Sequence, residues 1–214
     1  MYGSPRCNLA ALADTPDYTY AAAKITPVFN GNPAVQKVER EYLFIKPSTF
    51  VVFDRVASAA GTKRIWTLNL PGAPVINGNQ LTFTGAKSNR MDVYRVAPAG
   101  LAYTSNVPAP TDGDSMLDTK VRRVDVLDAA AAQSNFLHII ATNTVNSPII
   151  SGVTRSDATG QTGAQFTLSD GRAVTVRFAN ATTGGTLEIR NAAGVVQVSG
   201  LLPTTVVAPP VFRK

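Results

Sequence analysis

His138 is the only histidine in this chain of 214 residues, and its imidazole is the only side chain whose ordinary pKa lies near neutrality. Such a group could serve as a general base. The surrounding segment Asn135–Thr142 is almost continuously apolar, however, as is typical of a strand buried on both faces. No partner base or nucleophile is recognisable near it. We therefore expect His138 to be a core residue.

Other reactive side chains are few. Asp112, Asp114 and Asp118 have the spacing of a calcium loop, but they lack its later glutamate and its full ligand alternation, so we expect a polar turn. Cys7 is the only cysteine, which excludes a disulfide framework and a cysteine metal cluster. Nucleotide-binding and serine-hydrolase motifs are missing. The sequence thus predicts no catalytic residue, no metal and no cofactor.

The charge balance favours acidic partners. Lysine and arginine number 20 against 14 aspartates and glutamates, a formal charge of +6, and 13 of the cations are arginines. The dispersed cations are expected to lie on solvated strand faces; the alternative is a surface for an acidic polysaccharide, because arginine binds carboxylates and sulfates as a planar fork. The cations are dispersed, unlike those of nucleic-acid binders, and the apolar runs are too short to cross a bilayer. We expect neither nucleic acid nor membrane as a partner.

Five residues are the candidate ligand-binding set, because they combine the densest cationic spots with tyrosine rings that could stack on sugars: Arg64, Tyr94, Tyr103, Arg122 and Arg123. Trp66 alternates with Leu68 and Leu70, which indicates a core position.

The elements that position these residues are expected to be strands. Alanine, valine, threonine and glycine dominate, glutamate is scarce, and turn signals recur about every 8–14 residues. Arg40 and Asp54 fall on consecutive strands and are expected to pair. The hairpin turn Asn77-Gly78-Asn79 is expected between two short strands. We predict an all-β fold, a large antiparallel β-sandwich of about twelve strands with little helix. The predicted strands are 35–46, 49–56, 64–70, 75–76, 81–83, 91–96, 120–127, 135–142, 149–155, 164–168, 173–178, 185–190 and 195–198.

The domain organisation follows from composition. Residues 1–24 are expected to be a partly ordered N-terminal segment, 25–202 the β-sandwich domain and 203–214 a Pro-rich C-terminal arm. Residues 97–119 are expected to be a loop, and a helical turn is conceivable at 129–132. The first residues lack a basic end followed by an apolar stretch, so no signal peptide is expected in this chain. Exposed sheet edges would make dimerisation plausible.

Several strand patterns resemble those of one enzyme family. Asp17–Lys24, Val38–Pro47 and Phe50–Val56 resemble the β-sandwich part of heparinase II/III-like polysaccharide lyases. Trp66–Pro71 and Phe136–Ile140 look like later strands of the same region. The resemblance implies an N-terminal helical toroid joined to the sandwich. In that family a tyrosine and histidines at the interface cleave an acidic polysaccharide by β-elimination.

The sequence departs from that family at the catalytic positions. The toroid and the His-x-His-x-Asp-like segment that opens the sandwich are missing, and Asn69 stands where some members carry a histidine. The resemblance therefore implies a non-catalytic module that supports or binds an acidic polysaccharide, with the toroid of a parent lyase as a partner. It also implies a periplasmic or secreted location within a longer protein. One alternative is a structural or protein-interaction sandwich, and another is a complete lyase, against which the missing residues argue.

Overall fold

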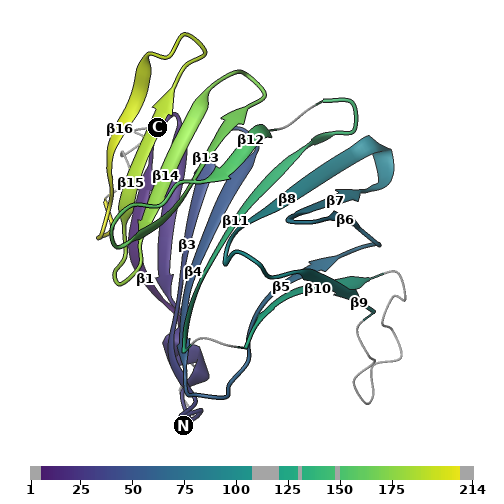
Figure 1. The fold of residues 1–214 in the computed structure, drawn as a ribbon. Coiled ribbons are helices and arrows are strands. Elements are labelled where there is room, and N and C mark those ends of the chain that lie inside the picture. Colours follow the sequence, from purple (N-terminus) through teal and green to yellow (C-terminus); the bar gives the residue numbers. More distant parts are fainter. Residues whose placement is uncertain (1–5, 108–120, 130–131, 148–149, 208–214) are drawn as a thin grey trace, which may run out of the picture.

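The computed structural model describes residues 6–107, 121–129, 132–147 and 150–207 (Figure 1). Within these ranges the chain forms sixteen strands and two short 3-10 helices, η1 (Thr26–Phe29) and η2 (Ala86–Ser88). Every strand pair is antiparallel, which confirms the predicted all-β sandwich, with more strands than the expected twelve. No helix in the described part of the chain is long and apolar enough to cross a membrane.

The strands make three sheets. The central sheet has, in spatial order, β1 (Asn8–Asp14), β2 (Tyr18–Lys24), β3 (Val35–Ile45), β4 (Thr49–Ser58), β11 (Gln133–Thr144), β8 (Asn89–Ala97), β7 (Gln80–Thr84) and β6 (Val75–Asn77). The five-stranded sheet has β12 (Ile150–Arg155), β13 (Gln161–Leu168), β14 (Ala173–Ala179), β15 (Gly185–Arg190) and β16 (Val196–Leu202). The three-stranded sheet has β5 (Arg64–Leu70), β10 (Arg122–Asp128) and β9 (Tyr103–Asn106).

The two smaller sheets pack on opposite faces of the central sheet (Figure 1). Successive side chains of a strand point to opposite faces, and β11 shows the consequence. Leu137 packs in the core beneath the five-stranded sheet, whereas its neighbour Phe136 packs beneath the three-stranded sheet. The almost continuous apolar sequence of β11 is therefore explained by two cores, as its pattern predicts.

A buried ionic network lies in the core beneath the five-stranded sheet. Arg55, which is 1% exposed, forms ion pairs with Glu39 and Glu41, and the hydroxyl of Tyr20 donates to Glu41. Burial raises the pKa of Glu41, while the charge of Arg55 opposes that rise. Breaking one member of such a network leaves its partners unpaired in a dry core.

Local turn chemistry is well predicted, whereas small residues are misleading. The hairpin through Asn77 and Gly78 is confirmed, and Gly78 takes the left-handed conformation at φ 59°. Strands β1 and β2 have no counterpart among the predicted strands, because alanine has low strand propensity. Ala11 and Ala22 are nevertheless buried at 0% and 2% exposure. Small side chains there let the central and five-stranded sheets approach each other.

Three further sequence expectations concern loops and ends. The expected loop at 97–119 contains a strand, β9. The aspartates of the possible calcium loop lie outside the described residues, as does the middle of the possible helical turn at 129–132. The segment after β16 lies against β1, where Val207 N donates to Leu12 O at 2.8 Å.

Candidate functional site

The inner face of the central sheet, defined as the face that bears the three-stranded sheet, is covered on one half only. Phe136 of β11, Val93 of β8 and Leu81 of β7 pack in the core with the three-stranded sheet. On the other half, Tyr42 and Phe50 remain 41% and 38% exposed. Tyr42 lies opposite Val52, which in turn lies opposite His138, so these side chains share the inner face.

His138 lies in the covered half and is fully buried. Its ring stacks on Trp66 with centroids 3.7 Å apart and an interplanar angle of 12°. Neither ring nitrogen has a hydrogen-bond partner among the described residues. Burial, and then the positive charges of Arg95 and Arg40, lower the pKa of His138 well below its ordinary value. The imidazole is therefore neutral and out of contact with solvent, as expected of a core residue.

Tyr103 and Arg95 complete this buried cluster. The Tyr103 ring lies 6.2 Å from the His138 ring, and the Arg95 guanidinium lies 5.9 Å from the centre of the Tyr103 ring. Burial raises the pKa of Tyr103, and the charge of Arg95 opposes the rise. A phenol with a raised pKa stays protonated at neutral pH and is not a base in this state.

Arg40 and Asp54 form the ion pair that the sequence predicts. Arg40 Nε lies 2.5 Å and Nη2 3.0 Å from the two Asp54 oxygens, a bidentate arrangement. Burial raises the pKa of Asp54, while Arg40 opposes that rise. Arg40 Nη1 also donates to the Tyr42 hydroxyl at 3.3 Å, which ties the pair to the uncovered half of the inner face.

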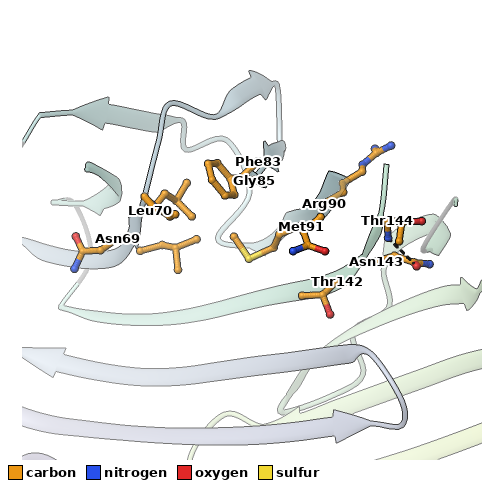
Figure 2. Close-up of a pocket in the computed structure, with 12 residues that line it drawn as sticks. Asn69, Leu70, Phe83, Gly85, Arg90, Met91, Thr142, Asn143 and Thr144 are labelled. Carbon is orange, nitrogen blue, oxygen red and sulfur yellow. Dashed lines mark hydrogen bonds between the residues drawn. The ribbon is translucent and has the colours of Figure 1, made fainter. Parts of the chain in front are cut away.

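A pocket opens where the end of the three-stranded sheet meets the central sheet, and we call it the mouth pocket (Figure 2). Its volume is about 600 Å³. Figure 2 shows Leu70, Phe83 and Met91 gathered on one another in its apolar part, with Thr142 and Asn143 on the strand below. The lining residues are Leu68, Asn69, Leu70, Pro71, Phe83, Gly85, Asn89, Arg90, Met91, Thr142, Asn143 and Thr144.

The rim of the mouth pocket offers free amide groups. Asn69 and Asn89 are exposed, and within the described ranges neither side chain makes a hydrogen bond. Amides donate and accept at once, which suits the hydroxyls of a sugar, while an apolar floor suits its C–H face. The arrangement can bind a polar chain, and it contains no general base. No group of three or more potential metal ligands occurs among the residues that the structure describes.

Two of the five candidate binding residues lie beside this pocket. Arg122 and Arg123 are the cross-strand partners of Leu70 and Asn69, respectively. Arg123 Nε donates to both oxygens of Asp125, at 2.9 and 3.0 Å, and its side chain keeps 44% exposure. Both arginines lie on β10, next to the β5 residues that line the pocket, and neither lines the pocket itself.

The structure places the other three candidates elsewhere. Arg64 is 3% exposed, with hydrogen bonds to Ser134 and Ser58, and Tyr103 is 6% exposed. Tyr94 packs against the core on the opposite face of the central sheet. The five residues therefore do not form one surface.

Sequence reasoning missed most of the pocket. Phe83, Met91 and Thr142 come from three different strands, and their types are ordinary for strands. No local pattern marks them, because the pocket exists only once β5, β7, β8 and β11 meet.

Neither a protein-family model nor a curated protein sequence matches this chain. Solved structures do match. A heparan sulfate lyase mutant from Pedobacter heparinus has a TM-score of 0.58 and 14% identity over 94% of this chain and 28% of its own. A heparinase III gene product has a TM-score of 0.59 and 11% identity over 92% of this chain and 27% of its own. Another heparinase III structure has a TM-score of 0.60 and 12% identity over 81% and 27%. The chain spans less than a third of these proteins, and its fold is a heparinase-like β-sandwich.

Proposed function

We propose that this chain is a non-catalytic β-sandwich module that binds or supports an acidic polysaccharide at the mouth pocket. The observation that carries the proposal is the pair of free amides of Asn69 and Asn89 at the pocket rim, with Arg122 and Arg123 on the adjacent strand β10. The net charge of +6 and the likeness to a heparan sulfate lyase support it. The burial of His138 argues for support rather than catalysis.

The proposal places the module in a longer periplasmic or secreted protein. A helical toroid of that protein would supply the catalytic groups, as the resemblance to the lyases implies. The matched structures are more than three times as long as the part that this chain covers, which supports such an arrangement.

Binding titrations with heparin, heparan sulfate and alginate at two salt concentrations test the proposal. We expect salt-sensitive binding that Arg123→Gln weakens about threefold, as a rim charge does. Arg190→Gln is the matched control. Its side chain is also 44% exposed and also pairs with a carboxylate two residues away, but it lies on the five-stranded sheet. Equal effects of the two variants would show that only net charge matters and would remove the mouth pocket from the proposal.

Ultraviolet absorbance of the unsaturated uronate product, measured in the same mixtures, tests the non-catalytic part. We expect no increase. An increase would make the chain a complete lyase and would overturn that part of the proposal.

A protein-interaction module is the second candidate function, and the uncovered half of the inner face favours it. Phe44 and Phe50 stack there with centroids 4.4 Å apart, next to the exposed Tyr42. Exposed aromatic clusters on a sheet are typical of protein contacts. A Phe50→Lys variant with unchanged polysaccharide affinity but lost association with a partner would select this function over the first.

A further inference from the structure

A second cavity lies at the other end of the seam between the central and three-stranded sheets, beneath η1. Its volume is about 460 Å³, and it shares no lining residue with the mouth pocket. Strands β3, β4, β5 and β11 and the 3-10 helix η1 all contribute to its wall. We call it the η1 cavity.

The η1 cavity has an open entrance and a buried floor. Phe29 and Ile65 are 41% and 44% exposed, and Lys63 is exposed beside them. At the inner end, Arg64 and Trp66 are only 3% and 5% exposed. A ligand would therefore enter past Lys63 and reach Arg64.

The Arg64 guanidinium at the floor has one donor group without a partner among the described residues. Arg64 Nε donates to Ser134 Oγ at 2.8 Å and Nη1 donates to Ser58 Oγ at 2.9 Å, and both acceptors are neutral hydroxyls. Nη2 has no hydrogen-bond partner in the described part of the chain, and the guanidinium has no ion pair there.

Of the nearby carboxylates, Asp54 is already paired with Arg40. Asp128, opposite Arg64 across β5 and β10, is linked to the guanidinium through Ser134 Oγ, which donates to Asp128 Oδ2 at 2.7 Å. The buried Nη2 group of Arg64 therefore still lacks an acceptor among the described residues, and a carboxylate oxygen is the strongest acceptor a ligand can offer it.

The apolar walls of the cavity favour a ligand whose body is apolar. Val38, Val56 and Phe136 line the cavity, together with Trp66. A sugar unit would place its hydroxyls against these apolar side chains without partners, which is unfavourable. An apolar body with a single anionic group matches both the walls and the floor.

We propose that the η1 cavity binds a small organic carboxylate with an apolar body, its carboxylate at Arg64 and its body against Val38, Val56 and Phe136. This site is independent of the mouth pocket and of the polysaccharide. Lys63 at the entrance attracts the anion, and Arg64 holds it in an environment where water does not screen the charge.

Trp66 makes the test direct, because it is the only tryptophan in the chain and lines the cavity. The probe is 3-phenylpropionate, titrated against the whole chain at constant ionic strength while tryptophan fluorescence is recorded. The neutral isostere 3-phenylpropionamide is titrated in parallel. We expect a saturable change with the acid and at least about tenfold weaker binding of the amide, the effect of a charge-assisted hydrogen bond.

Three variants locate the binding. Val38→Phe fills the cavity without changing charge and should abolish the saturable signal. Arg64→Gln should weaken the acid about tenfold or more and leave the amide unchanged. Lys63→Gln, at the exposed entrance, should lower the affinity for the acid about twofold. This variant still tests the role of charge if Arg64→Gln does not fold. Arg190→Gln, on the five-stranded sheet and outside the cavity, is the control and should bind as the parent does.

Two results would overturn the proposal. Equal affinities for acid and amide would show that no cation of the cavity contacts the ligand. Binding that survives Val38→Phe would place the probe elsewhere on the protein.

Discussion

Replacing His138 by phenylalanine should stabilise this protein, and increasingly so in acid. In the parent, the imidazole is fully buried against Trp66, and neither ring nitrogen has a partner among the described residues. An unsatisfied buried polar group costs about 1–3 kcal/mol. Phenylalanine keeps the stacked ring and removes that cost, while its larger ring adds about 1 kcal/mol of crowding. We expect a net gain of about 1 kcal/mol in the free energy of unfolding at pH 7.

The pH dependence has a definite sign. The pKa of His138 is well below its ordinary value in the folded state, so below about pH 6.5 the unfolded state binds more protons. The free energy of unfolding of the parent is therefore unaffected by His138 titration above about pH 6.5 and decreases as the pH falls below that value. With an unfolded pKa near 6.5, the loss between pH 7 and pH 5 approaches about 2 kcal/mol. The advantage of His138→Phe should thus grow to about 3 kcal/mol at pH 5.

Urea unfolding followed by circular dichroism at pH 5, 6, 7 and 8 measures this difference. His138 is the only histidine, so the carboxylate titrations common to both proteins cancel in the difference. A difference between variant and parent that stays constant across this range would show that the imidazole keeps its ordinary pKa. It would refute the inference that His138 is dry and unpaired.

Two further substitutions test the packing of the sheets, each against a matched control in urea unfolding. Gly185→Ala should cost about 3 kcal/mol or more, because its Cβ would lie 1.9 Å from a backbone oxygen of β14, whereas Gly200→Ala meets nothing within 4 Å and should cost little. Tyr20→Phe removes the hydroxyl that donates to Glu41 and should cost about 1–3 kcal/mol, whereas Tyr18→Phe loses no hydrogen bond within the described ranges and should be nearly neutral. Equal costs within either pair would contradict the packing or the hydrogen bond in question.

The patterning of side chains along the chain determined most of the local structure. Alternation of apolar residues predicted β3 and β5 and placed Trp66 in the core, and a continuous apolar run predicted β4. The apolar surroundings of His138 predicted its burial. The pairing of Arg40 with Asp54 followed from their places on consecutive strands. These features depend on one strand or on adjacent strands, and local sequence carries that information.

Apolar patterning alone left the sheet assignment open. The continuous apolar run of β11 indicates that both of its faces are buried, but it does not show that one face meets the five-stranded sheet and the other the three-stranded sheet. Likewise, alanine-rich β1 and β2 are strands because neighbouring strands and a facing sheet bury them, and intrinsic propensity does not predict this.

Tertiary structure alone decided where ligands could bind. The mouth pocket and the η1 cavity each draw on several strands that are distant in sequence. Their walls exist only because the three-stranded sheet covers half of the inner face and stops. A side chain such as Arg64 has the same type whether it faces solvent or a buried floor. Long-range sheet packing sets its surroundings, and these surroundings determine whether it is a solvated cation or a group that can bind a ligand.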